Sequence, residues 1–148
     1  MPKKQGTGII FYDAARDRIL LFRRDAIPTI PFPGMLDIIG GAVEAGETPV
    51  QTIKREVFEE LFDRCTGEGY RLKSLTLFRR FTDMLGIDEY IYSQPIGFSI
   101  EDIDLLEGEQ LVWLGRKDLA GLKMAYGYEA VVKEFFESEF MRGHKKCL

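Results

Sequence analysis

Histidine and cysteine are scarce in this chain of 148 residues, which contains one histidine and two cysteines. Cys65 and Cys147 are too few for a disulfide framework or a cysteine-rich metal cluster, so we expect a reducing, cytoplasmic environment. No stretch approaches the ~18 apolar residues of a membrane-spanning helix, so we expect no membrane partner. The apolar run at residues 9–12 is also too short for the core of a signal peptide.

Internal repeats, low-complexity tracts and linker-like segments are absent as well. The composition, 45% apolar and 30% charged, is typical of a globular protein and excludes disordered and fibrous classes. We therefore expect a single domain over residues 1–148, with residues 143–148 as a frayed basic tail. The only histidine, His144, falls in that tail and is expected to be inert.

Basic residues are missing from residues 81–109, which carry eight acids, while residues 44–68 carry seven acids and three bases. The whole chain has a net charge of −4, so the rest of it is basic. This segregation argues against a nucleic-acid partner, which needs one dominant basic face. It leaves open an acidic site that holds cations or, alternatively, solvated acidic loops.

The pattern of apolar residues predicts a β-β-β, helix, β-β-β, helix order, which indicates an α/β sandwich with a mixed β-sheet between helices. Three prolines exclude a helix at residues 25–34. Pro95 is expected to mark a bulge or an edge. The expected strands lie at residues 8–12, 18–23, 36–43, in both halves of 71–100 and at 110–114, with a helical turn at 117–122 and a last helix at 128–141.

The first helix has the clearest start. Thr48 is a suitable N-cap, Pro49 is tolerated at the first helical position, and Gln51 completes a capping box. Four apolar residues at helical spacing are expected to form its buried stripe: Val50, Ile53, Val57 and Leu61.

Three glutamates, Glu56, Glu59 and Glu60, lie at i, i+3 and i+4 on one side of this helix. Two carboxylates ~4 Å apart repel each other by about 4 kcal/mol at an effective dielectric constant of 20. A divalent cation removes this penalty, and Mg²⁺ or Mn²⁺ prefers oxygen ligands of this kind. An ordinary acidic surface helix is the alternative.

The glutamates continue a longer pattern: Gly41, five residues, Glu47, seven residues, then Arg55 and the sequence EVFEE. This segment resembles the Nudix box, G-x5-E-x7-R-E-U-x-E-E-x-G-U with U apolar, which is the signature of the Nudix hydrolases. Such a match arises by chance in roughly one of a hundred thousand chains of this length. Trp113 and the residues after it also resemble the strand and turn that follow the central hairpin in that family.

The box departs from the pattern at its end, where Phe62 replaces the last glycine and Asp63 the apolar residue. Ile39 also replaces the proline that often precedes the glycine pair. The family glycine helps to end the helix, so we expect a different exit here, with the helix about one turn longer. Neither change removes a carboxylate of the box.

The resemblance implies a fold, an activity and a metal site. The fold is the Nudix α/β/α sandwich, and the activity is cleavage of a nucleoside diphosphate linked to another moiety, by water attack at phosphorus. The implied cofactor is Mg²⁺ or Mn²⁺, and its ligands are Glu56, Glu59, Glu60 and the carbonyl oxygen of Gly40. Arg55 is implied to pair with Glu47 and with a helix carboxylate.

The general base in this family is a glutamate, either on the box helix, with Glu59 as the candidate, or on the loop before the tryptophan strand. That loop holds Glu107 and Glu109, of which Glu107 is favoured slightly as a base or an additional ligand. A solvated loop is the alternative for both. Most other acids of residues 81–109 are expected to be exposed.

The sequence supports the candidate substrate contacts less strongly than the candidate metal ligands. Arg24 matches the phosphate-contacting arginines of the family better than Arg23, and Asp37, just before the glycine pair, is a candidate for reading a base edge. Phe32, Tyr90 and Tyr92 could stack on a nucleobase or belong to the core. Arg79 and Arg80 could contact substrate or cover a sheet face.

The leading hypothesis is therefore a metal-dependent pyrophosphohydrolase acting on a small nucleotide-type diphosphate, with a homodimer left open. The alternative is a catalytically weak Nudix-fold module that binds nucleotides or regulates, suggested by Phe62. The isopentenyl diphosphate isomerase branch of the fold needs a catalytic cysteine and metal-binding histidines, which the expected core strands lack.

Overall fold

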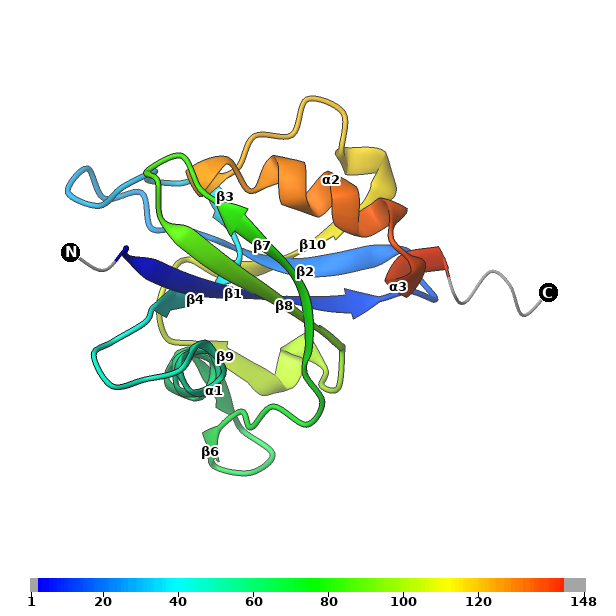
Figure 1. Ribbon diagram of the computed structural model, residues 1–148. Helices are drawn as coiled ribbons and strands as arrows, with labels where there is room; N and C mark the ends of the chain where they lie inside the picture. Colours follow the sequence, from blue (N-terminus) through cyan, green and yellow to red (C-terminus); the bar gives the residue numbers. More distant parts are fainter. Residues whose placement is uncertain (1–2, 143–148) are drawn as a thin grey trace.

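A computed structural model describes residues 3–142, so the expectations for the tail and for His144 lie outside the described residues. A large mixed sheet forms the middle layer, with helix α1 (Pro49–Glu60) on one side and helix α2 (Glu129–Glu137) on the other (Figure 1). This arrangement is the predicted α/β sandwich. Among the described residues, none of the helices combines the length and the apolar character needed to cross a membrane.

The large sheet has the strand order β10-β2-β1-β8-β7, with β3 paired to β2 and β4 paired to β1. Strands β1 and β8 are parallel, whereas the other pairs are antiparallel, so the sheet is mixed as predicted. Its strands are β1 (Gln5–Asp13), β2 (Arg18–Arg23), β3 (Leu36–Asp37), β4 (Ile39–Ala42), β7 (Thr76–Thr82), β8 (Asp88–Pro95) and β10 (Gln110–Gly115).

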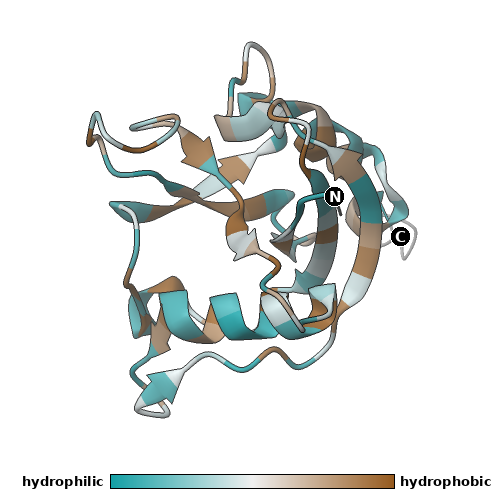
Figure 2. Ribbon diagram, turned by 60° about the vertical axis from the view of Figure 1, so that its left-hand side comes forward, coloured by the Kyte–Doolittle hydropathy of each residue, from teal (hydrophilic) through white to brown (hydrophobic). Residues whose placement is uncertain are grey.

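Strand β1 is buried along most of its length because both faces of the sheet are covered. Side chains alternate between the two faces, so Ile9 and Phe11 pack in the core below α1, whereas Ile10 packs in the core below α2. Figure 2 shows α1 as a mainly hydrophilic ribbon with apolar residues at intervals, as expected for a helix with one buried side. The sheet therefore separates two apolar cores.

Helix α1 begins as the sequence predicts. The hydroxyl of Thr48 accepts a hydrogen bond from the backbone N–H of Gln51, and the Gln51 side chain accepts one from the backbone N–H of Thr48. Ile53 and Val57 are fully buried, but Val50, in the first turn, is 40% exposed. The predicted stripe is thus wrong at Val50 and correct over the rest of the helix.

The end of α1 corrects the expected longer helix. The helix ends at Glu60, and the chain turns at once into strand β5 (Leu61–Asp63), which pairs with β6 (Glu68–Gly69) and with β9 (Ile103–Leu105). Leu61 is extended and fully buried, so burial and strand pairing stop the helix where a glycine does so in the family pattern. This second, three-stranded sheet was not predicted.

The C-terminal helical layer is also divided. The predicted helix at residues 128–141 is two helices, α2 and α3 (Glu139–Arg142), separated by Ser138 in an extended conformation. Phe135 and Phe136 of α2 are fully buried against the sheet. The remaining short helices are the 3-10 turns η1 (Ile100–Asp102), η2 (Arg116–Asp118) and η3 (Ala125–Gly127).

The β7–β8 hairpin turns at residues 83–87, close to the expected position. Its irregularity lies in β7, between Leu77 and Arg79, rather than at Pro95. Pro95 is the last residue of β8, where β7 no longer pairs with it, so the missing N–H costs no hydrogen bond to β7. Pro95 marks the end of β8, but β8 lies between β1 and β7 inside the sheet, so neither the expected bulge nor an edge strand is found there.

Candidate functional site

The predicted ion pair between Arg55 and Glu47 is present in the structure. Arg55 donates from Nε to Glu47 Oε2 at 2.7 Å and from Nη2 to Glu47 Oε1 at 3.0 Å, so the contact is bidentate. The Thr52 hydroxyl donates to the same carboxylate at 2.8 Å. These bonds, chiefly those from Arg55, lower the pKa of Glu47 to about 2. Glu47 is therefore ionised and fixed in place.

The same guanidinium reaches two of the three helix carboxylates. Arg55 Nη1 donates to Glu56 Oε1 at 3.0 Å and to Glu59 Oε2 at 3.3 Å. Glu44 adds a fourth carboxylate, 3.6 Å from Nη2. One arginine thus partly neutralises and orients several acids, which is the role that the box spacing implies for it.

Glu60 lies on the buried side of this cluster, only 8% exposed, and it forms no ion pair with Arg55. Burial and the neighbouring carboxyl groups of Glu56 and Glu107 raise its pKa to about 10. The backbone N–H of Leu106 donates to the carbonyl of Glu60 at 2.8 Å and holds the Glu107 loop against the helix end. The structure therefore brings Glu107 to the helix glutamates.

The predicted glycine pair lies directly against this cluster. A Cβ atom on Gly41 would stand 2.3 Å from the Glu56 carboxyl group, and one on Gly40 would stand 2.0 Å from the Thr7 carbonyl oxygen. A larger residue at Gly40 would displace β4 from β1, and one at Gly41 would displace the Glu56 carboxyl group or β4. Glycine is thus required here by close packing between backbone and carboxylate.

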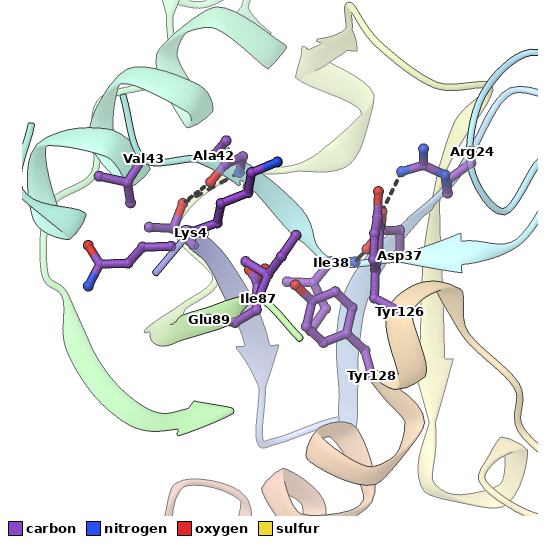
Figure 3. A pocket seen from close by; sticks show the side chains of 15 residues that line it. Lys4, Arg24, Asp37, Ile38, Ala42, Val43, Ile87, Glu89, Tyr126 and Tyr128 are labelled. Atoms are coloured by element: carbon purple, nitrogen blue, oxygen red, sulfur yellow. Dashed lines mark hydrogen bonds and ion pairs between the residues drawn. The ribbon is translucent and has the colours of Figure 1, made fainter. Parts of the chain in front are cut away.

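A cavity of about 460 Å³ extends from the glycine pair across the end of β1 (Figure 3). Gly40 and Gly41 line it at the side of α1, whereas Arg24, just after β2, and Asp37 of β3 line it elsewhere. Because Gly41 also contacts Glu56, the cavity reaches the backbone that packs on the acid cluster. The cavity and the cluster together form one candidate active site.

Arg24 and Asp37, the two predicted substrate contacts, are paired with each other. Arg24 Nη1 donates to Asp37 Oδ2 at 2.7 Å, and the backbone N–H of Ile38 donates to Asp37 Oδ1 at 2.7 Å. Asp37 is 4% exposed, and burial raises its pKa to about 6 despite the bond from Arg24. Tyr126 covers the arginine, with its ring centre 5.5 Å from the guanidinium carbon.

Sequence reasoning missed three polar residues near this cavity: Asp83, Glu89 and Tyr128. Glu89 and Tyr128 line the cavity, and Asp83 lies beside Glu89. Asp83 and Glu89 are buried and are exceptions to the expectation that most acids of residues 81–109 are exposed. The lack of any base in that segment was the available signal, but it did not reveal which acids are buried.

Other candidates lie outside the site. Glu109 lies against β2, where its N–H donates to the carbonyl of Arg23, and it is not among the groups that perturb Glu60. Arg79 pairs with Glu134 and Arg80 with Asp88 on the surface, so neither contacts the cavity.

The three aromatic residues considered for stacking on a nucleobase do not line the cavity. Tyr92 is buried in the core below α1, and Tyr90 packs under the guanidinium of Arg80. Phe32 packs on Tyr126, with ring centres 4.7 Å apart. Of these aromatic rings, only Tyr126 lines the cavity.

Within residues 3–142, no three histidine, cysteine, aspartate or glutamate side chains converge as they stand into a complete metal site. Two of the predicted ligands, Glu56 and Glu59, are bonded to Arg55 instead. The donor set still fits a hard divalent cation, because Glu56, Glu60 and Glu107 are neighbouring oxygen ligands whose mutual repulsion a cation relieves.

Comparison with known proteins gives one family and many structural matches. A family model described as the NUDIX domain matches residues 2–135. A structure from a study of MutT from Aliivibrio salmonicida and Vibrio cholerae has a TM-score of 0.70 at 21% identity, covering 92% of this chain and 98% of the other. A MutT protein from Bacillus halodurans has a TM-score of 0.64 at 23% identity, covering 91% and 83%.

The NUDIX domain of Shewanella oneidensis NrtR, solved with ADP ribose, has a TM-score of 0.62 at 15% identity, covering 88% of this chain and 82% of the other. At these identities the structural matches show the fold alone. A comparison with curated proteins found no matching relative.

Proposed function

The chain belongs to the Nudix family, whose members generally hydrolyse pyrophosphate bonds, and we propose that it is a metal-dependent pyrophosphohydrolase. Its substrate is a nucleoside diphosphate linked to another moiety. The observation that carries the proposal is the carboxylate cluster that Arg55 holds in place beside the cavity. A purely structural acidic helix does not require this packing against a glycine pair.

Glu56, Glu59, Glu60 and the carbonyl oxygen of Gly40 would hold Mg²⁺ or Mn²⁺. A cation there neutralises the pyrophosphate and lowers the pKa of the attacking water. Arg55 keeps the carboxylates oriented, because its bidentate contact with Glu47 fixes the guanidinium.

The general base is Glu107 or a helix glutamate such as Glu59. Glu107 is supported by its approach to Glu60, which places it next to the proposed ligands. A carboxylate in this position accepts the proton of the attacking water. Arg24 supplies positive charge at the other side of the cavity, where it binds the substrate together with Asp37.

The proposal is tested with a panel of nucleotide sugars, oxidised nucleoside triphosphates and dinucleoside polyphosphates. Products are identified by mass, with and without Mg²⁺ or Mn²⁺, in water enriched in ¹⁸O. We expect metal-dependent cleavage to a nucleotide and a second product, with one ¹⁸O atom at phosphorus in one of the two products. Glu60→Gln lowers kcat by about 10²-fold or more, whereas the exposed control Glu134→Gln keeps parental activity.

Absence of turnover throughout the panel, or an unchanged kcat in Glu60→Gln, would contradict the proposal. Saturable nucleotide binding without hydrolysis would instead favour the binding-module alternative. Phe62, which motivated that alternative, lies in β5 and pairs with Gly69, on the strand that follows the glutamates. Cytoplasmic location, a homodimer and the lack of a nucleic-acid partner stay predictions.

A further inference from the structure

The cavity borders a pair of carboxyl groups, Asp83 and Glu89, that takes no part in the cluster on α1, and of the two only Glu89 lines the cavity. Glu89 on β8 is 6% exposed and lines the cavity, where Figure 3 shows it beside Tyr128. Asp83, in the turn before β8, is 5% exposed and approaches Glu89 closely. The family resemblance assigns no role to either residue.

The pair has an unpartnered buried oxygen. Asp83 Oδ1 accepts hydrogen bonds from the backbone N–H groups of Leu85 at 2.8 Å and Ile87 at 3.0 Å. Asp83 Oδ2 is buried and has no hydrogen-bond partner among the described residues. A buried carboxylate oxygen without a donor costs free energy, so a proton or a ligand is expected to satisfy it.

No lysine or arginine of residues 3–142 forms an ion pair with Asp83 or Glu89; the cavity arginine, Arg24, is bonded to Asp37. Two buried carboxylates that face each other without a cation cannot both remain charged. Because Asp83 already accepts two N–H groups, the proton of the pair is placed on Glu89. Burial, followed by the proximity of Asp83, accordingly raises the pKa of Glu89 to about 8.

The position of this proton decides what the cavity offers a ligand. If the Glu89 hydroxyl donates to Asp83 Oδ2, the other Glu89 oxygen presents only an acceptor. Asp37 has acceptor capacity left as well, because each of its oxygens receives a single hydrogen bond. The buried lining contributed by β3 and β8 is therefore rich in acceptors.

We infer that Glu89, held by Asp83 and Tyr128, selects a nucleobase through its amino N–H donors. This inference rests on the proposed function, since it takes the cavity to be the site of the substrate's base. Guanine, adenine and cytosine carry an exocyclic amino group, whereas uracil and thymine present a carbonyl oxygen in its place. A carbonyl oxygen facing the Glu89 acceptor loses a hydrogen bond and leaves the acceptor unpaired.

Cytidine and uridine monophosphates test the inference most directly, because their rings have the same size and differ only at the C4 amino group and N3 of cytosine, which are a carbonyl oxygen and an N–H in uracil. Each is titrated into the full-length protein by calorimetry at pH 7 without metal. We expect CMP to bind at least about tenfold more tightly than UMP. Equal affinities, or no binding of either nucleotide at millimolar concentration, would overturn the inference.

Two variants separate the role of Glu89 from a general effect on the fold. Glu89→Gln keeps a carbonyl acceptor for the ligand and an amide N–H for Asp83, so we expect the CMP-to-UMP ratio to stay within about threefold of the parent. Glu89→Leu removes both groups, and we expect the ratio to fall to about one. Circular dichroism verifies that each variant is folded, and Glu134→Gln is the surface control.

Retention of the parental ratio in Glu89→Leu, or its loss in Glu89→Gln, would also overturn the inference. The two proposals fail separately. Selective binding of CMP by a protein that hydrolyses nothing in the substrate panel contradicts the pyrophosphohydrolase and leaves the role of Glu89 intact. Hydrolysis without preference between cytidine and uridine derivatives does the reverse.

Discussion

Two groups of carboxylates, one packed beside the cavity and one reaching its wall, deal with their charge in opposite ways. The group on α1 includes Arg55, which bonds Glu47, Glu56 and Glu59 and keeps Glu47 ionised. The pair of Asp83 and Glu89 has no cation among the described residues and retains a proton instead. The two groups thus differ in whether an arginine is built into them.

The largest expected effect concerns the pair without a cation. The pKa of Glu89 is raised from 4.5 to about 8, so the folded protein binds more protons than the unfolded chain between these values. This contribution to stability is complete below about pH 4.5 and is lost as the pH rises to about 8. Asp83, Tyr128 and Asp37 are the ionisable groups that act on Glu89.

Glu89→Gln removes this titration, so the variant should gain stability relative to the parent as the pH rises. We expect a gain of up to about 4 kcal/mol in the free energy of unfolding between pH 5 and pH 8.5. Urea denaturation of both proteins across this range measures the difference. A constant difference between parent and variant would show that Glu89 is ionised throughout.

Replacing Arg55, the cation of the group on α1, by lysine is expected to have the next largest effect. Lysine cannot reproduce the bidentate contact of Arg55 with Glu47, so the helix carboxylates lose their common anchor. We expect Arg55→Lys to lower kcat by about 100-fold. Arg64→Lys, in an exposed pair with Asp104, is the matched control and should keep parental kcat. Equal kcat values in the two variants would mean that the bidentate contact of Arg55 with Glu47 has no role in catalysis.

Gly41→Ala acts where the cavity meets the group on α1. The added Cβ atom would stand 2.3 Å from the Glu56 carboxyl group, so β4 or Glu56 must move. We expect about a tenfold loss of kcat, because a small displacement of a positioning group weakens catalysis. At Gly115 a Cβ atom would meet its nearest neighbour at 3.6 Å, and Gly115→Ala should be nearly neutral. Steady-state kinetics of both variants decide the point.

The smallest effect is expected outside both groups. Arg79 pairs with Glu134 on the surface, where solvent screens the interaction. Arg79→Gln should change the free energy of unfolding by less than about 0.5 kcal/mol and leave kcat unchanged. A larger change in thermal denaturation would give this ion pair a role that its exposure does not suggest.

The group on α1 could be predicted from the sequence because the residues that determine it lie close together along the chain. A capping box fixes where the helix begins, and helical periodicity then places Glu56, Glu59 and Glu60 on one side. The family pattern adds Glu47 and Arg55, which the structure joins in an ion pair. The same locality explains why the order of strands and helices was largely correct.

The pair of Asp83 and Glu89 could not be predicted in the same way. Its members come from a turn and a strand, and they meet Tyr128 only when α2 packs on the sheet. The end of α1 was missed for a similar reason, since Leu61 leaves the helix to pair with Leu105 much later in the chain. Local patterns carry no information on such pairings.

Strand β5 has a further consequence for the order in which the molecule assembles. The helix glutamates can come together as soon as α1 forms, whereas Glu107 joins Glu60 only when β9 pairs with β5. Contacts between segments so distant in sequence form slowly during folding. We therefore expect the repulsion between Glu60 and Glu107 to arise at a late step of folding, after local structure has formed.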